Sequence, residues 1–271
     1  SNDKANTMRW VAKAQLTDAR KAVTCAEFAP RHLGLRIATG SADGFVRIYE
    51  AIDVMNLNHW PMNTSIEVES SSNTSESTTH TQHGHSSSSL QKHTDLSSVL
   101  SSSQSLGVTA LSWCNSRFEP ATLVVGGHSG NVTVYRYSES SRAWSVSVKL
   151  PRHRSATLDV SWAPNVGRSF HLLASCGKDG RLTVHKLKRG NGNGNGNGKT
   201  PQRTLALESS NDLDTDGFRV WRVEWNITGT VLASSGDGGK VQLWKSDFCD
   251  RWKCVSDVQG DFSHLNQARE Q

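Results

Sequence analysis

The sequence predicts an all-β protein, because one strand-and-turn unit recurs four times along its 271 residues. Each unit begins with an alternating apolar run that ends in Phe or Trp and passes through a loop into a strand of small residues. A turn containing glycine and a second alternating run complete the unit. The units occupy residues 23–49, 108–135, 158–185 and 220–244.

The spacing inside the unit is nearly constant. Six positions separate the residue before the turn glycine from the residue that closes the unit in three copies, and seven in the fourth, where Gly239 adds one. These pairs are Asp43 with Tyr49, Ser129 with Tyr135, Asp179 with His185, and Asp237 with Trp244. Coincidence is a poor explanation for such registration, so the segments are interpreted as copies of one structural unit.

The local chemistry of each unit indicates hairpins joined in series. Asp-Gly or Ser-Gly between two alternating runs supplies the positive φ that a tight turn requires. Residues 46–49 alternate β-branched side chains with Arg and Tyr, which is typical of a strand. Small residues fill the middle strands at 38–41, 126–127, 174–177 and 233–236. They let neighbouring sheets approach closely, as radially stacked blades require near their axis.

These features predict a β-propeller that is incomplete and open, with about four blades. The closing Tyr49, Tyr135 and Trp244 stand where WD-repeat families carry the tryptophan of their name, so the units resemble WD repeats. The aspartate that should follow is absent from all four copies. Core packing explains the aromatic residues, which indicate a fold and not a chemistry.

Composition sets the outer limits on function. No segment approaches the roughly 18 consecutive apolar residues of a membrane span, and we expect a soluble protein without a secretory signal. The five cysteines are scattered, so they predict neither a disulfide framework nor a paired zinc site and suit a reducing compartment. The net charge of +5 is dispersed, which argues against specific nucleic-acid binding.

Low-complexity segments interrupt the propeller, which otherwise spans residues 1–271. Residues 63–104 are rich in Ser, Thr and His and poor in large apolar groups, so we expect a disordered insertion there. Residues 190–200 alternate Asn and Gly over most of their length and are expected to form a flexible loop. Residues 260–271 are expected to be a flexible tail.

No catalytic constellation emerges from the sequence. GxSxG, P-loop and HExxH motifs are absent. Four histidines fall in the expected insertion, where nothing fixes a metal geometry: His80, His83, His85 and His93. We therefore predict no enzyme activity, no catalytic residue, no metal site and no cofactor.

Two further features have ordinary explanations. His153 and His185 are interpreted as packing or surface residues and not as bases. Residues 186–189 faintly resemble the basic motif of phosphoinositide-binding propellers, but the second Arg pattern and the associated aromatic residue are missing. A lipid-binding or enzymatic propeller is therefore the least favoured of three functional classes.

Loop sequences that a generic propeller does not require carry a closer resemblance. They lie within residues 23–56, 163–173, 220–245 and 251–254, and include APNVGRSFHLL and RWKC. The chain resembles the nucleoporin family that is homologous to the propeller subunit of the COPII outer coat and belongs to the Y-shaped scaffold complex of the nuclear pore. This match covers most of the chain outside the two insertions.

The resemblance implies a structural role in nucleocytoplasmic transport of protein and mRNA, at the nuclear envelope. It implies an open six-bladed propeller, of which this chain would lack about two N-terminal blades. A helical scaffold nucleoporin would complete it in trans with a donated blade, and other Y-complex subunits are further expected partners. A COPII-like vesicle coat is the alternative, as is a nutrient-signalling coat of the GATOR type at the lysosome or vacuole.

The partner-facing edge is expected beside the last unit, where the donated blade would sit. The candidate partner-binding residues are Trp244, Phe248, Asp250 and Trp252. Ordinary packing within the blade explains Trp244 and Trp252 equally well, so both interpretations stay open at the level of sequence.

Overall fold

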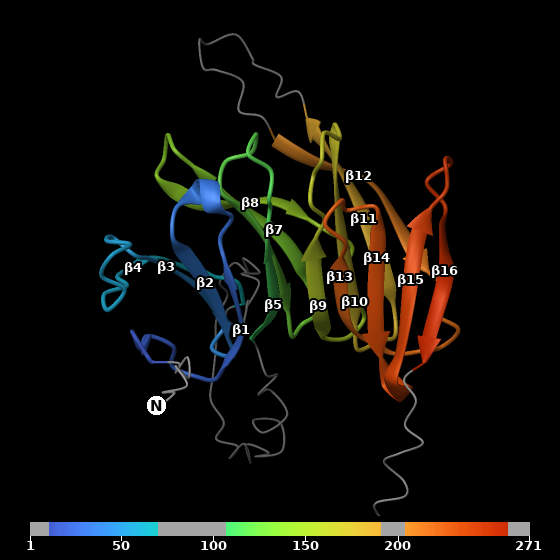
Figure 1. Cartoon of the computed structure of the whole chain (residues 1–271), viewed down its shortest axis with the longest axis horizontal. Helices are drawn as coiled ribbons and strands as arrows, with labels where there is room; N and C mark the ends of the chain where they lie inside the picture. Colours follow the sequence, from blue (N-terminus) through green and yellow to red (C-terminus); the bar gives the residue numbers. More distant parts are fainter. Residues whose placement is uncertain (1–10, 70–106, 191–203, 260–271) are drawn as a thin grey trace, which may run out of the picture.

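The computed structural model describes residues 11–69, 107–190 and 204–259, which form four antiparallel sheets of four strands each (Figure 1). We call these sheets blades 1 to 4. Blade 1 contains β1 (Val23–Phe28), β2 (Arg36–Ser41), β3 (Phe45–Glu50) and β4 (Met62–Glu67). Blade 2 contains β5 (Val108–Trp113), β6 (Thr122–Gly127), β7 (Val132–Ser138) and β8 (Ala143–Lys149).

Blades 3 and 4 repeat the same strand order. Blade 3 contains β9 (Thr157–Trp162), β10 (Phe170–Gly177), β11 (Leu182–Gly190) and β12 (Thr204–Leu213). Blade 4 contains β13 (Val220–Trp225), β14 (Val231–Gly236), β15 (Lys240–Ser246) and β16 (Trp252–Gln259). Two short 3-10 turns, η1 (Arg31–Leu33) and η2 (Asp237–Gly239), lie in blades 1 and 4.

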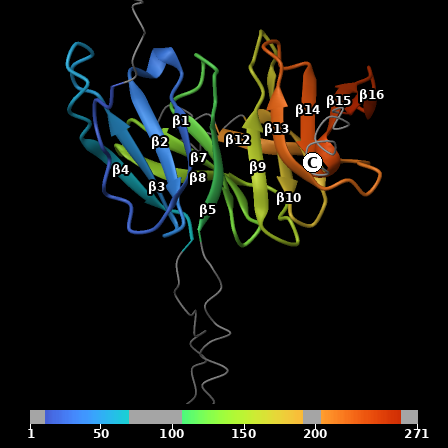
Figure 2. The same cartoon turned by 60° about the horizontal axis from the view of Figure 1, so that its bottom comes forward.

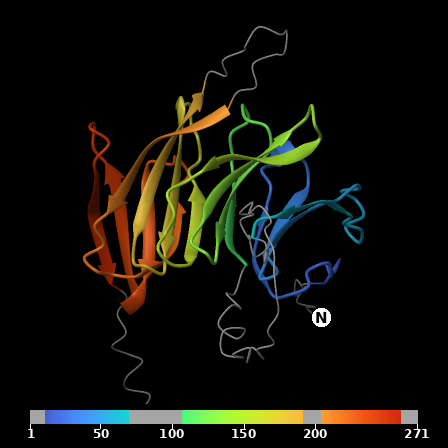
Figure 3. The same cartoon turned by 180° about the vertical axis from the view of Figure 1, so that it is seen from behind.

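The blades follow one another in chain order around an open arc, with blade 1 at one end and blade 4 at the other (Figures 1 and 3). The first strands of the blades, β1, β5, β9 and β13, lie side by side along the inner edge (Figure 2). Residues from all four of these strands line a central cavity of about 590 Å³. The architecture confirms the predicted open β-propeller.

The predicted turns have the geometry that their glycines permit. Gly44, Gly130 and Gly180 have φ values of 87°, 88° and 82°. Each donates its main-chain N–H to the carbonyl three residues earlier, over 3.0–3.1 Å. In blade 4 the extra residue forms η2 instead, and Gly239 takes the positive φ of 67°. The one-residue difference in spacing is thus a different turn between the same two strands.

Each blade has a fourth, outer strand that the repeat did not reveal. These strands are β4, β8, β12 and β16, and they pair with the closing strand of each unit. Residues 63–67 belong to β4, although the composition of 63–104 predicts disorder, because Ile66 pairs with Val46 and is only 8% exposed. The rest of the expected insertion, most of the 190–200 loop and the 260–271 tail lie outside the described residues.

The core lies between the blades and not within them. Three clusters of buried apolar side chains each join one blade to the next. The side chains that blade 1 places under blade 2 are Ala38, Val46, Ile48 and Ile66. A single sheet of this kind therefore depends on its neighbour to remove one face from water.

Small residues permit this close approach, as predicted. A Cβ atom added at Gly126 would lie 2.7 Å from Thr157 Cγ2 in blade 3. A Cβ atom at Gly40 would lie 2.4 Å from Val108 Cγ1 in blade 2. Real Cβ contacts are not this short, so any larger residue would push the two sheets apart.

A chain of hydrogen bonds runs through blade 3. His153 Nδ1 lies 3.2 Å from Asp179 Oδ1, and His153 Nε2 lies 2.9 Å from the Ser175 hydroxyl. The same hydroxyl lies 3.0 Å from His185 Nε2, and His185 Nδ1 lies 2.9 Å from Ser210 Oγ. Burial lowers the pKa of His153 and lowers that of His185 to about 3. Both rings are packing residues, as the sequence indicated, and His185 is neutral in the folded protein at pH 7.

In blade 4, a tryptophan makes the contact that corresponds to the one between His185 and Ser175. Trp244 closes the fourth unit as His185 closes the third, and its indole Nε1 donates to Ser234 Oγ over 2.8 Å. In blades 3 and 4 the closing ring thus contacts a buried serine, as His in one blade and as Trp in the other.

A buried carboxylate joins blades 2 and 3. The Glu119 side chain is 1% exposed and lies 2.9 Å from the Arg136 guanidinium of its own blade. It also pairs with Arg189 and lies 3.6 Å from His171 Nε2, both in blade 3. Burial alone would raise the pKa of Glu119, but His171 and the two guanidiniums hold it below its ordinary value. Such a pair orients the two blades, because leaving the charge unpaired inside the protein is costly.

Gly126→Ala should lower the free energy of unfolding by about 1–3 kcal/mol, because the added methyl group overpacks the contact between blades 2 and 3. Urea denaturation measures this difference. The matched control is Ser235→Ala. Ser235 has the equivalent register position in blade 4, on the face that points away from blade 3, and this variant should change stability by less than about 0.5 kcal/mol. Equal losses in the two variants would contradict the prediction.

His185→Trp should reduce the loss of stability on acidification. An unfolded histidine gains its proton near pH 6.5, whereas folded His185 stays neutral down to a pKa of about 3. The stability that His185 contributes is therefore complete above pH 6.5 and falls below it by about 1.4 kcal/mol per pH unit.

The measurement is the slope of unfolding free energy against pH between 4.5 and 6, in wild type and variant. Comparing slopes removes any pH-independent change in packing energy. It also removes the contribution of Glu27, which is the same in both proteins; burial raises the pKa of Glu27 to about 7, so its contribution to the slope has the opposite sign. Replacing the exposed Phe118 with Leu is the control; it removes no ionisable group and should leave the slope unchanged. The same slope in His185→Trp and wild type would refute the assignment.

Candidate partner-binding face

The two predicted tryptophans lie inside the protein. Trp244 in β15 is 2% exposed. Trp252, the first residue of β16, is half-buried, and its ring centroid lies 5.6 Å from that of Trp225 in an edge-to-face arrangement. Both belong to the cluster between blades 3 and 4. Their packing holds blade 4 against blade 3, and it leaves almost none of the Trp244 side chain accessible to another chain.

The other two predicted residues lie in the turn between β15 and β16. Asp247 Oδ1 accepts the main-chain N–H groups of Cys249 and Arg251, which fixes the turn. Phe248 is fully exposed at its tip. Asp250 instead faces blade 3, where its carboxylate lies 2.6 Å from Lys186 Nζ. The four residues thus do not form one continuous surface, and Phe248 alone presents its whole side chain to solvent.

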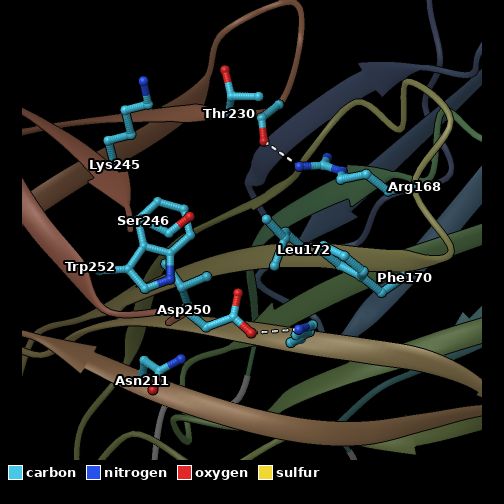
Figure 4. A pocket seen from close by; sticks show the side chains of 12 residues that line it. Arg168, Phe170, Leu172, Asn211, Thr230, Lys245, Ser246, Asp250 and Trp252 are labelled. Atoms are coloured by element: carbon cyan, nitrogen blue, oxygen red, sulfur yellow. Dashed lines mark hydrogen bonds and ion pairs between the residues drawn. The ribbon is translucent and has the colours of Figure 1, made fainter. Parts of the chain in front are cut away.

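A crevice of about 240 Å³ lies between the outer parts of blades 3 and 4 (Figure 4). Leu172 and Trp252 form part of its apolar wall. Arg168 donates to the carbonyls of Pro164 and Gly229 over 2.7 Å each, and Lys186 lies 4.5 Å from the centre of the Phe170 ring. Because these cations already have partners, the crevice is best described as a joint between two blades.

The basic stretch 186–189 is similarly occupied. Lys186 pairs with Asp250, Lys188 pairs with Glu208, and Arg189 pairs with Glu119. Leu187 between them is fully buried. The stretch therefore offers no free cluster of cations to an anionic headgroup in this structure.

The free face of blade 4, which points away from blade 3, repeats the side chains of a buried interface. On this face Glu224 pairs with Ala233 and Ala233 with Leu243, while Val241 pairs with Val258. The alternate residues Val223, Trp225, Leu232 and Trp244 point the other way and are buried against blade 3. Val258 is 55% exposed and Glu224 is exposed, so the face is open to solvent.

The corresponding residues of blade 1 show what such a face does. There Glu27 pairs with Ala38 and Ala38 with Ile48, while Val46 pairs with Ile66. The four apolar members are at most 8% exposed because blade 2 covers them. The free face of blade 4 thus has the same residue classes at the same register positions as a face that is buried in blade 1.

The central cavity contains carboxylates that join neighbouring blades. Burial raises the pKa of Glu27 to about 7 and raises that of Asp159. Each carboxylate accepts a main-chain N–H from the next blade, at Trp113 and Val223 respectively. In the described ranges, no group of three or more His, Cys, Asp or Glu residues could hold a metal ion. These acids are engaged in holding blades together.

All five cysteines are free, and burial raises the pKa of Cys25 to about 11 and that of Cys114 to about 12, so these thiols are not reactive at pH 7. Among the residues that the structure describes, no helix has the length and apolar character needed to cross a membrane. The four histidines at 80–93 lie outside the described residues.

Comparison with known proteins agrees with the architecture. The family model described as WD domain, G-beta repeat matches residues 11–50 and 208–245, which overlap β1 to β3 of blade 1 and, after the end of β12, β13 to β15 of blade 4. Nucleoporin SEH1-B of Xenopus laevis is 38% identical over 96% of this chain, which spans 64% of that relative's length. Nucleoporin SEH1 of Danio rerio is 36% identical over 98% of this chain and 65% of the relative.

This chain matches a slightly larger share of a human relative. Nucleoporin SEH1 of Homo sapiens is 36% identical over 100% of this chain and 67% of its own length. This chain thus spans about two thirds of the relatives that it matches. The repeats, the open arc of blades and this degree of identity together show that the chain belongs to the WD-repeat nucleoporin SEH1 family.

Proposed function

We propose that this protein is a structural, non-enzymatic scaffold subunit of the nuclear pore complex, and that the free face of blade 4 binds another chain. The observation that carries the proposal is the match between this face and the covered face of blade 1. A sheet face of Ala, Val and Leu that is buried everywhere else in the molecule favours a further blade as its cover.

The partner that best fits is a helical scaffold nucleoporin that contributes a β-blade, as the family resemblance implies. A blade supplies a complementary apolar face, whereas an isolated helix does not offer main-chain donors to the inner strand. Phe248, which is exposed at the β15–β16 turn, is a candidate for a peripheral contact. Asp250, Trp244 and Trp252 then act indirectly, by fixing blade 4 against blade 3.

The relatives favour the nuclear pore among the locations considered. Their names describe nucleoporins, which supports a location at the nuclear envelope and a role in transport of protein and mRNA. Their names lend no support to a lysosomal or vacuolar location, and no feature of the structure favours a vesicle coat.

Leu243→Glu and Ala233→Arg should each weaken partner binding by at least about thirtyfold, because each would bury an unpaired charge under the partner's blade. The measurement is the affinity of this full chain for each helical scaffold nucleoporin of the same organism, produced together and separated by size-exclusion chromatography. Fluorescent fusions of the two variants should also lose their concentration at the nuclear rim.

Phe118→Glu is the control, because Phe118 is 79% exposed on the loop between β5 and β6 and lies in blade 2. It should bind and localise as wild type does. Unaltered binding by both face variants, with folding verified by thermal unfolding, would refute the assignment of this face. Failure of the wild-type chain to bind any of these nucleoporins would refute the proposed class of partner.

A further inference from the structure

The innermost strands of neighbouring blades are joined by hydrogen bonds that recur along the arc. Between blades 1 and 2, the main-chain N–H of Trp113 donates to Glu27 Oε2 over 3.1 Å. The indole Nε1 of the same tryptophan donates to the main-chain carbonyl of Glu27 over 3.2 Å. One glutamate therefore accepts two hydrogen bonds from the residue that ends the next inner strand.

The other two junctions use the same principle. Between blades 2 and 3, the N–H of Trp162 donates to Ser112 Oγ over 3.1 Å, while its buried indole Nε1 has no hydrogen-bond partner among the described residues. Between blades 3 and 4, the indole of Trp225 donates to the carbonyl of Ser161 over 3.1 Å, and the N–H of Val223 donates to Asp159 Oδ2 over 3.0 Å. In these hydrogen bonds the earlier blade supplies acceptors and the later blade supplies donors, whereas the hydroxyl of Thr24 in blade 1 donates in the opposite sense to the Val108 carbonyl over 2.6 Å.

The register assigns Glu224 to the acceptor position of blade 4. Glu27, Ser112, Ser161 and Glu224 each stand one position before the aromatic residue that ends the inner strand. Because side chains alternate along a strand, the residue at this position points toward the following blade when the aromatic residue points toward the preceding one. Glu224 is exposed, and its carboxylate makes no hydrogen bond or ion pair with another described residue.

We propose that Glu224 sets the register of the partner's blade by accepting two hydrogen bonds from its innermost strand. The carboxylate accepts a main-chain N–H, and the main-chain carbonyl accepts the indole N–H of a tryptophan that ends that strand. This inference rests on the proposed function and specifies the chemistry of the partner. The occupant is a β-blade of another protein with a terminal tryptophan on its inner strand.

Charge supports this choice of occupant. Burying a carboxylate under an apolar surface without donors is strongly unfavourable, so an occupant without N–H groups at this point is disfavoured. A second copy of this chain fits less well, because Phe28 ends the inner strand of blade 1 and has no N–H on its ring. The Glu224 carbonyl would then lack its indole donor.

The test adds a fifth blade of known chemistry to the C-terminus of the full chain. A second copy of residues 107–150, which is blade 2, is joined after Gln271 by a flexible linker. In the native protein this blade already places Trp113 on Glu27. The copy therefore offers to blade 4 the same face that it offers to blade 1.

Hydrogen exchange of the amides in β13 to β15 reports whether the added blade covers blade 4. The expected result is increased protection in the fusion, reduced about tenfold or more by Glu224→Ala and restored to within about threefold by Glu224→Gln, which keeps an acceptor oxygen. Trp113→Phe in the added copy alone should reduce protection by about fivefold, and its effect should shrink in the Glu224→Ala background.

The outcomes separate the two proposals. Protection that Glu224→Ala leaves unchanged would overturn the role of Glu224 while retaining blade 4 as a binding face. No protection in any fusion would contradict both the role of Glu224 and the binding of a blade to this face. Protection lost equally in Glu224→Ala and Glu224→Gln would also overturn the acceptor role, because glutamine preserves it.

Discussion

The lateral packing of one blade face on the next is the constraint on which the whole structure depends. Each blade is a single sheet of four strands, and it cannot shield its own layer of Ala, Val, Ile and Leu side chains from water. The interfaces therefore carry the hydrophobic stabilisation, and each additional blade gains stability from its neighbour. Glycine at positions 40 and 126 matters for the same reason, since it sets how closely two faces can meet.

Polar contacts make these interfaces directional. Inner-strand acceptors such as Glu27 point forward along the arc, and tryptophan donors such as Trp113 and Trp225 point backward. The Glu119 cluster adds a buried ionic contact between blades 2 and 3, and Asp250 with Lys186 adds a partly exposed one between blades 3 and 4. Apolar burial favours association in general, whereas these fixed donors and acceptors select one orientation of it.

Much of the fold is predictable from the repeated unit, because three of its strands carry local signals. The turn glycines require positive φ, the small middle strands require close approach, and the alternation requires a sheet. The outer strands carry weaker signals, because β4 has no regular alternation and β8 alternates without a turn glycine before it. β4 and β8 read MNTSIE and AWSVSVK, with mostly exposed side chains, and they lie outside the repeated unit although they pair with its closing strands, β3 and β7.

The proposed binding face was harder to predict, and the reason is physical. Aromatic residues near the end of the last unit suggest a surface contact, yet Trp244 fills the position that a hydrogen-bonded core ring occupies in blade 3. The free face consists of Ala233, Val241 and Leu243, which look like ordinary core residues in the sequence. Only the strand register shows that these residues point away from blade 3.

The two ends of the described arc are chemically different, and this difference determines how another chain can extend it. Blade 4 presents acceptors and small apolar residues, which is the surface that blades 1 to 3 offer forward. Blade 1 presents the opposite kind of face, on which Phe28 is 59% exposed in place of a tryptophan. A blade that binds blade 4 through its tryptophan-bearing face must then direct its own acceptors away from it. The proposed contact would therefore be heterologous and would add a blade in one direction only.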